Sequence, residues 1–130
     1  DYLQRNIRCL KVEPNKLPEE IIIQNTLKAK QDIVGGDIEY AYLENDNNVV
    51  LICNEFGKLN GLPYNRDINY DVIAGTFLIV RDEDSGEDRS LLDEQIEKYK
   101  NIFNEKSIKD TNVKITKIML EKSKININEI

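Results

Sequence analysis

The most apolar run of the chain, residues 72–80, places the strongest constraint on the fold. In an extended strand, Val72, Ala74, Leu78 and Val80 share one face, and Ile73, Phe77 and Ile79 share the other. A strand that is apolar on both faces must be covered on both sides, so we expect other elements to pack above and below it. Gly75 interrupts the run, which indicates a bulge or a close backbone approach.

The segments before this run predict two hairpins and a helix. Alternation over residues 7–13 and the three isoleucines at 21–23 favour two paired strands. Residues 38–43 and 49–53 flank a turn-like segment and predict a second hairpin, which we expect at the centre of the sheet. Asn25 is the predicted N-cap of a short helix that ends at Gly35.

The segments after the run predict a charged connection, a helix and a tail. Residues 81–89 carry five carboxylates and are typical of a solvated, mobile loop. Ser90 and Asp93 resemble a capping box. The helix they begin has a stripe that we expect to be buried, formed by Leu92, Ile96, Tyr99 and Phe103. Residues 107–110 break this pattern, and the tail fits both a strand and a basic helix, with a helix over 111–122 favoured.

The order of these elements, ββαββ-loop-βα with a C-terminal tail, predicts an α+β fold. We expect a mostly antiparallel sheet of about five strands with two or three helices. A chain of 130 residues is most simply one domain, spanning residues 1–130.

Composition excludes several kinds of site. The chain has no histidine, so a Ser/His/Asp or Cys/His catalytic group cannot form, and we expect no catalytic residue, no metal site and no cofactor. Cys9 and Cys53 lie in apolar segments and are predicted to be buried, reduced thiols. With no apolar run long enough to span a bilayer and no visible signal peptide, the sequence predicts a cytoplasmic protein. The net charge of −6 argues against direct nucleic-acid binding.

The candidate site is the segment 54–66, which we interpret as a long structured loop between two core strands. Four apolar side chains are expected to pin it to the body: Phe56, Leu59, Leu62 and Tyr64. Its cations and amides suit a phosphate or carboxylate. The candidate binding residues are Asn54, Glu55, Lys58, Asn65, Arg66 and Glu39.

Each of these groups also has an alternative interpretation. Arg66 can instead pair with Glu39 or Glu55 in a purely structural role, and the asparagines can close turns. Glu39 sits among apolar neighbours, so it is either partly buried or at the exposed start of a strand. If both are desolvated, Glu39 and Glu55 can act as a general acid and base. Tyrosines at positions 40, 42, 64 and 70 can form a stacking patch or simply pack on the sheet.

Several short motifs occur in order along the chain. They are Lys11-Val12-Glu13-Pro14, Asn25-Thr26-Leu27, Val34-Gly35-Gly36-x-Ile38-Glu39, Cys53-Asn54-Glu55-x-Gly57-Lys58-Leu59, Gly61-Leu62-Pro63-x-Asn65-Arg66, Ala74-Gly75-Thr76-Phe77 and Leu92-Asp93-Glu94-Gln95. Together they resemble domain of unknown function 3846 over about residues 7–103, with residues 108–130 as a C-terminal extension. The family occurs in bacteria, phages, plasmids and integrated mobile elements and carries no assigned activity. The resemblance therefore implies a context but transfers no functional residue.

The function hypothesis combines that context with the candidate loop. We expect a phage or mobile-element accessory protein that acts as a non-enzymatic binding module and antagonises a host defence system. Its partner would be a host or element-encoded protein, or a small anionic ligand, and the chain itself can form a homo-oligomer. The alternatives are an acidic mimic of nucleic acid that inhibits a host DNA-binding enzyme, and an enzyme that works through carboxylates and an arginine. No membrane partner is expected.

Overall fold

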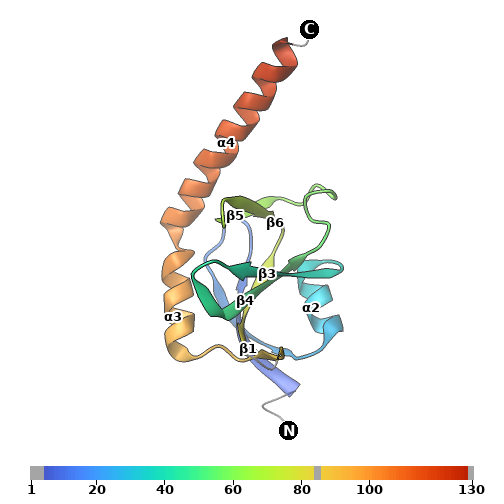
Figure 1. The fold of residues 1–130 in the computed structure, drawn as a ribbon, viewed down its shortest axis with the longest axis vertical. Coiled ribbons are helices and arrows are strands. Elements are labelled where there is room, and N and C mark those ends of the chain that lie inside the picture. Colours follow the sequence, from blue (N-terminus) through green and yellow to red (C-terminus); the bar gives the residue numbers. More distant parts are fainter. Residues whose placement is uncertain (1–4, 84–85, 129–130) are drawn as a thin grey trace.

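The computed structural model describes residues 5–83 and 86–128, the last four by their backbone alone, and shows sheets flanked by helices (Figure 1). The strands are β1 (Asn6–Val12), β2 (Glu19–Gln24), β3 (Ile38–Leu43), β4 (Asp46–Asn54), β5 (Tyr64–Ile68), β6 (Asp71–Ala74), β7 (Phe77–Asp82) and β8 (Asp88–Arg89). The helices are α2 (Leu27–Val34), α3 (Asp93–Ile102) and α4 (Glu105–Asn128). The predicted α+β fold with a mostly antiparallel sheet is confirmed.

The main sheet has the strand order β2-β1-β7-β4-β3, and the short β8 pairs with the end of β7. Every pairing in it is antiparallel, and both predicted hairpins, β1–β2 and β3–β4, are present. The expected central position of the second hairpin is wrong, because β7 occupies the middle and β3 lies at an edge. Since β7 is apolar on both faces, it gains most from the place that is covered on both sides.

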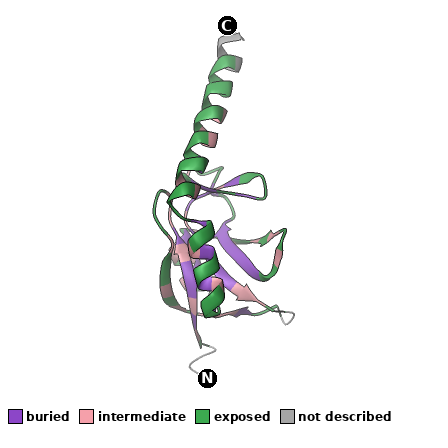
Figure 2. Ribbon diagram, turned by 90° about the vertical axis from the view of Figure 1, so that its left-hand side faces the viewer, coloured by how far each residue is buried: buried purple, intermediate pink, exposed green. Residues whose placement is uncertain are grey.

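The two faces of the sheet carry separate cores. On one face, strand side chains such as Leu10 and Phe77 pack against Ile96 and Tyr99 of α3 and Phe103, its C-cap. On the other face, Leu78 and its neighbours pack against Ile33 of α2. Figure 2 shows the exposed outer surface of a helix lying in front of the buried strands.

The apolar run 72–80 is divided between two strands, β6 and β7, which belong to different sheets. The division falls at Gly75, whose φ is +89°, and a Cβ there would lie 2.8 Å from Cδ1 of Leu62. The Gly75 amide also donates to the Pro63 carbonyl at 2.7 Å, so the expected close backbone approach is present beside this side-chain contact. Residues 67–71, which the sequence predicts as a turn, belong to the β5–β6 hairpin, and its tip residues Asn69 and Tyr70 have φ of 51° and 68°. Positive φ at both tip residues is the geometry of a tight type I′ hairpin turn.

The helix starts differ by a residue or two from the prediction. Thr26, and not Asn25, is the N-cap of α2, and its hydroxyl accepts a hydrogen bond from the Ala29 amide at 3.2 Å. Gly35 is the left-handed C-cap, as predicted. At α3, Ser90 is not the cap, because its hydroxyl accepts from the Arg8 amide at 2.9 Å and so joins the loop to β1. Leu92, which we expected to be buried, is 45% exposed.

Helix α4 is twice the predicted length and includes residues 107–110. The boundary between the two helices lies earlier, at residues 103–104, where the Asn104 side chain accepts a hydrogen bond from the Ser107 amide at 3.1 Å. The first half of α4 is fastened to β5, since Thr111 accepts from the Asp67 amide at 3.3 Å and Lys114 pairs with Asp67 at 2.9 Å. The second half extends away from the body (Figure 1).

The acidic segment 81–89 is less free than its composition predicts. Asp88 is only 8% exposed, and its carboxylate binds the buried Lys30 ammonium at 2.5 Å and the Tyr40 hydroxyl at 2.9 Å. Glu83 pairs with Arg81 and Arg89. Asp84 and Ser85 lie outside the described residues. The prediction of a fully solvated loop is therefore wrong at Asp88, where charge on α2 fixes the segment to the sheet.

Candidate functional site

Asn54, at the end of β4, is used entirely within the protein. Its amide nitrogen donates to the Val34 carbonyl at 3.2 Å, and its amide oxygen accepts from the Phe56 amide at 2.9 Å. Only 7% of the residue is exposed. Asn54 therefore joins the end of α2 to the start of the candidate loop, and its side chain is not available to a ligand.

The loop after β4 is ordered by its backbone more than by its apolar side chains. Phe56 and Leu59, two of the four expected anchors, are 45% and 84% exposed. The loop is held by turn hydrogen bonds, including Leu62 N to Gly57 O at 2.9 Å. A Cβ at Gly57 would lie 2.5 Å from the Ala74 carbonyl oxygen, so the loop presses directly on the backbone of β6.

Arg66 lies inside the protein, with 1% of its surface exposed, so its expected place on a recognition surface is wrong. Its guanidinium donates to the Lys16 carbonyl at 2.7 Å, the Phe103 carbonyl at 3.2 Å, the Ser107 hydroxyl at 2.9 Å and the Asn65 side-chain oxygen at 3.0 Å. Among the described residues it contacts no carboxylate, so the alternative of an ion pair with Glu39 or Glu55 is also wrong. Burial lowers the pKa of Arg66 from its ordinary value.

Asn65 completes this arrangement from the other side. Its amide nitrogen donates to the Val12 carbonyl at 2.8 Å and to the Gly75 carbonyl at 2.9 Å. We call Asn65 and Arg66 with their partners the Arg66 clamp. The clamp joins β1, β5 and the junction of α3 with α4, and its two central residues, Asn65 and Arg66, are buried.

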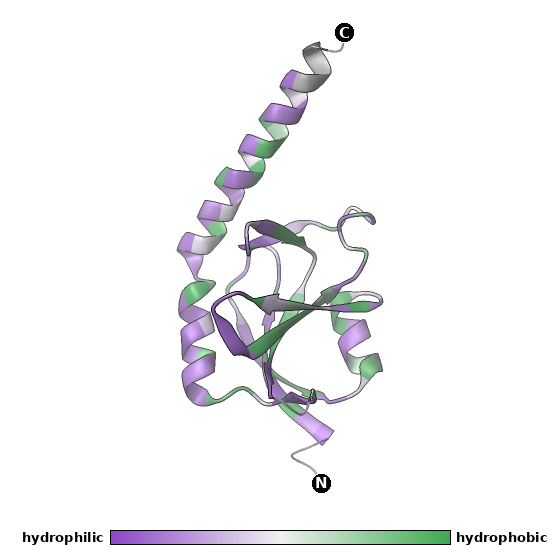
Figure 3. Ribbon diagram, in the orientation of Figure 1, coloured by the Kyte–Doolittle hydropathy of each residue, from purple (hydrophilic) through white to green (hydrophobic). Residues whose placement is uncertain are grey.

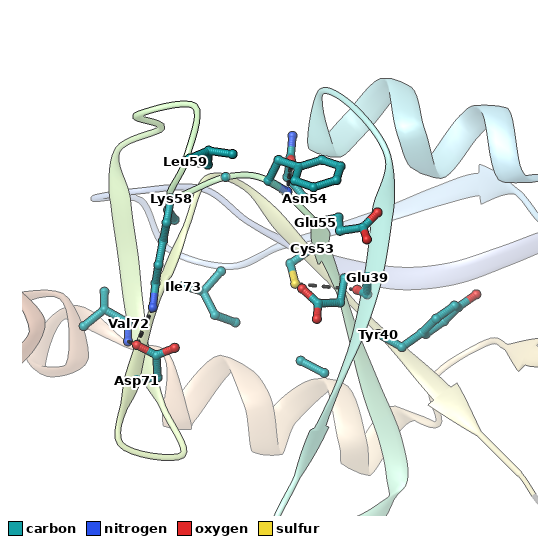
Figure 4. Close-up of a pocket in the computed structure, with 14 residues that line it drawn as sticks. Glu39, Tyr40, Cys53, Asn54, Glu55, Lys58, Leu59, Asp71, Val72 and Ile73 are labelled. Carbon is teal, nitrogen blue, oxygen red and sulfur yellow. Dashed lines mark hydrogen bonds and ion pairs between the residues drawn. The ribbon is translucent and has the colours of Figure 1, made fainter.

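The other predicted residues surround a cavity of about 450 Å³ (Figure 4). We call it the edge cavity, because it lies beside β3, the last strand of the main sheet. Its lining comes from three segments: Glu39, Tyr40 and Ala41 of β3; Cys53 to Leu59, which span the end of β4 and the start of the loop; and Asp71 to Ala74 of β6. Ala41, Ile73 and Phe56 give it an apolar lining, and the Glu39 carboxylate points into it toward Ile73 (Figure 4).

The charges of the edge cavity are mostly negative. Lys58 pairs with Asp71 at 2.5 Å, and its hydrogen bond lowers the pKa of that carboxyl below the ordinary value, against an opposing effect of burial. Glu39 and Glu55 are exposed, and neither carboxylate has a hydrogen-bond or ion-pair partner among the described residues. Three carboxylates stand against one ammonium, so the cavity favours a cationic group over the anion suggested by the sequence.

The chemistry of the cavity offers no activated nucleophile. The Cys53 thiol is its one sulfur, and burial, followed by the nearby Glu39 charge, raises the pKa of Cys53 to about 11. At neutral pH this thiol is protonated and unreactive. In the described part of the chain, no group of His, Cys, Asp and Glu is arranged to hold a metal ion. No helix there is long and apolar enough to cross a membrane.

The outer edge of β3 has unused backbone groups next to the cavity. At one end, the Asn69 side chain donates to the Tyr42 carbonyl at 2.6 Å and accepts from the Glu44 amide at 3.4 Å, in place of a neighbouring strand. Outward groups recur at every second residue of an antiparallel strand, so the N–H and C=O of Tyr40 face the same side. Asn69 therefore covers one end of the edge and leaves the stretch along Glu39, Tyr40 and Ala41 open.

The sequence predicts Glu39, Glu55 and Lys58 as site residues, and all three line the cavity. It does not predict the β6 residues that also line it. Ile73 and Asp71 were assigned to a core strand and a turn, because the division at Gly75 was not foreseen. The hairpin that they form had one signal, the Asn69-Tyr70 pair between polar and apolar residues, and asparagine is common in such turns.

A comparison with family models matches residues 7–104 to the family described as Domain of unknown function (DUF3846). The match covers most of the chain and ends at the start of α4, so the projecting helix lies outside it. No curated protein and no solved structure matches the chain.

Proposed function

The chain belongs to the DUF3846 family, and on that premise we propose that it is a non-enzymatic module that binds an extended polypeptide segment at the edge cavity. The observation that carries the proposal is the open edge of β3 beside a cavity with two unpartnered carboxylates. The bound segment would carry a lysine or arginine next to an apolar side chain.

The backbone of β3 supplies the affinity in this proposal. An exposed edge strand presents a row of unpaired N–H and C=O groups, and an extended peptide can add to it as a further strand. Proteins commonly cover or charge such edges, and in the described part of the chain it is the Tyr42 end that is covered, by Asn69. The remaining stretch opens directly onto the cavity.

The side chains of the cavity supply the selectivity. A peptide in an extended conformation directs alternate side chains to one face, so one residue would enter the apolar lining formed by Ala41 and Ile73 while a neighbour reaches the rim. At the rim, Glu39 and Glu55 would accept charge-assisted hydrogen bonds from a lysine or arginine. Lys58 is already neutralised by Asp71 and would contribute little to binding an anion.

The same geometry gives less support to the other two hypotheses. A general acid and base need desolvated carboxyls, and both Glu39 and Glu55 are exposed. A mimic of nucleic acid needs an array of outward carboxylates, but Asp88 is directed inward onto Lys30. We keep the phage and mobile-element context as part of the proposal: a module that captures a segment of a host protein would suit antagonism of a host defence.

The test is to select peptides from a random display library on the full chain and to measure the affinity of the enriched peptides. We expect enrichment of lysine or arginine beside an apolar residue, and amide chemical shifts that change along residues 38–41 and 55–59. Glu39→Gln and Glu55→Gln should each weaken binding by roughly tenfold, as the loss of a charged contact does.

Glu19→Gln is the matched control, because Glu19 is exposed on β2, the opposite edge strand. It should leave the peptide affinity within about twofold of the wild type. N-methylation of alternate peptide amides adds a second control, since only the register that faces β3 should lose binding. The absence of any enriched peptide, or equal affinities for the Glu39 and Glu19 variants, would refute the proposal.

A further inference from the structure

Helix α4 exposes a face that is both apolar and basic. Val113, Lys117, Leu120 and Lys124 follow one another at helical spacings of three and four, so they share one side of the helix. All four are exposed, with Val113 and Leu120 at 56% and 58%. We call these four residues the outward face of α4. Figure 3 shows apolar and polar residues alternating along the helix as it leaves the body.

The body of the same chain does not cover this face. The side of α4 that packs inward carries Thr111, Ile115 and Ile118, and the last two line a small cavity against Tyr64 and Tyr70 of the β5–β6 hairpin. No ion pair of Lys117 or Lys124 is formed among the described residues. The outward face therefore presents apolar surface and positive charge that no described residue of the same chain covers or neutralises.

The charge of the chain is divided between its parts. Helix α4 has six lysines and three acidic residues, a net charge of +3, whereas residues 1–104 have twelve basic and twenty acidic residues, a net charge of −8. On α3, Glu94 and Glu97 are exposed and without an ion-pair partner among the described residues. The two helices follow one another along the chain, and α4 continues from the end of α3 away from the body (Figure 1).

We propose that the chain forms a symmetric dimer in which the outward face of each α4 packs on α3 of the other copy. An antiparallel arrangement about a two-fold axis brings α4 against the partner's α3 twice, as an isologous interface requires. Pairing of two α4 helices is disfavoured, because it would bring Lys117 and Lys124 of both copies together. The second copy's α3 instead offers carboxylates to the lysines and buries Val113 and Leu120.

The first experiment measures the mass of the full chain in solution by size-exclusion chromatography with light scattering. At about 100 μM we expect twice the chain mass of 15.1 kDa, and salt at about 500 mM should shift the equilibrium toward the monomer by screening the charges. Lys117→Glu with Lys124→Glu should raise the dissociation constant by at least about tenfold. Lys28→Glu with Lys122→Glu changes the net charge equally at sites outside the outward face and should leave it within about twofold.

A charge swap identifies the surface that α4 meets. Glu94→Lys with Glu97→Lys should weaken the dimer as much as the α4 variant does, and one chain carrying all four changes should dimerise again. A carbodiimide crosslink between lysines of α4 and carboxylates of α3, found between isotopically light and heavy copies, would support the same contact. A monomeric wild type, equal effects of the two lysine pairs, failure of the swap, or intermolecular crosslinks that avoid α3 would each overturn the proposal. Circular dichroism of every variant shows that it is folded.

Discussion

Charged residues of the segment 54–66 belong to both the Arg66 clamp and the edge cavity. The two regions differ in the groups that these charged side chains contact. Arg66 is buried and donates to four oxygens of its own chain. Glu39 and Glu55 are exposed, and no donor among the residues that the structure describes binds either carboxylate. Charged residues near glycines in a loop are thus compatible with a structural joint and with a binding site. A structural joint is distinguished from a binding site by whether the charged groups form hydrogen bonds within the protein. Those bonds depend on elements that are distant in sequence.

The largest effect that separates the two regions is expected for Arg66→Ala. The substitution leaves the Lys16 and Phe103 carbonyls, the Ser107 hydroxyl and the Asn65 side-chain oxygen without their donor, and it opens a void at a fully buried position. We expect the free energy of unfolding to fall by about 3–5 kcal/mol, from unsatisfied buried groups together with lost packing. Urea denaturation measures the change.

Lys58→Ala is the matched control for the clamp, because it removes a cation from the same loop on the solvent side. It should change the free energy of unfolding by no more than about 1 kcal/mol. If Arg66→Ala were as mild as Lys58→Ala, the distinction between a structural and an exposed cation would fail.

A smaller effect is expected for Gly57→Ala, which sharpens the comparison at the wall of the cavity. The backbone conformation of Gly57 is not left-handed, so the added Cβ is opposed only by the Ala74 carbonyl oxygen, 2.5 Å away. To relieve that contact, the loop would move away from β6. We expect the free energy of unfolding to fall by about 1–3 kcal/mol, as it does when a packed site is overfilled. Thermal denaturation measures the loss, and shifted amide signals of residues 71–74 locate it. Unchanged stability and spectra would show that the loop is not pressed against β6.

The smallest effect concerns pH. The pKa of Asp71 is lowered from 3.8 chiefly by the hydrogen bond from Lys58, so folding favours its charged form. The stability that this pair contributes is complete above the ordinary pKa and is lost as pH falls through the lowered value. At neutral pH, Asp71→Asn should lower the free energy of unfolding by less than about 1 kcal/mol, since both partners are exposed.

Once the pH lies below the lowered pKa of Asp71, the Asp71 variant and the wild type should converge. Denaturation curves across this range measure the difference, with Glu19→Gln compared in parallel. A difference that stays constant as pH falls would show that the Asp71 charge does not stabilise the fold.

The sequence predicts which segments form strands and helices better than it predicts which of these elements pack together. Local alternation was enough for the β1–β2 and β3–β4 hairpins, because each depends on residues close in the chain. The division of the run 72–80 was missed because Gly75 could mark a bulge as well as a complete change of sheet. The partners of Gly75 lie outside the run: Leu62 packs against it from the loop, and its amide donates to the Pro63 carbonyl at 2.7 Å.

The candidate site was predicted in part for the same reason. Glu39, Glu55 and Lys58 meet at the cavity because residues at the ends of a β hairpin are close together. Arg66 was misplaced because three of its four partners, residues 16, 103 and 107, are distant in sequence, and only Asn65 is local. A local sequence pattern does not predict such contacts. The buried ion pair of Lys30 and Asp88 was missed for the same reason, because it joins α2 to the distant segment 81–89, which the sequence predicts to be solvated.

The pairing of β1 with β7 also has a consequence for how the chain reaches its native state. Residues 10–12 of β1 pair with residues 77–79, so the middle of the sheet cannot close until most of the chain is present. Contacts between such distant residues carry a loop-closure cost and slow folding. As the chain leaves the ribosome, the β1–β2 hairpin and α2 would emerge first, with the apolar side chains of β1 exposed until β7 arrives. Aggregation during synthesis is therefore most probable in that interval, and a chain truncated before residue 77 should depend on chaperones to remain in solution.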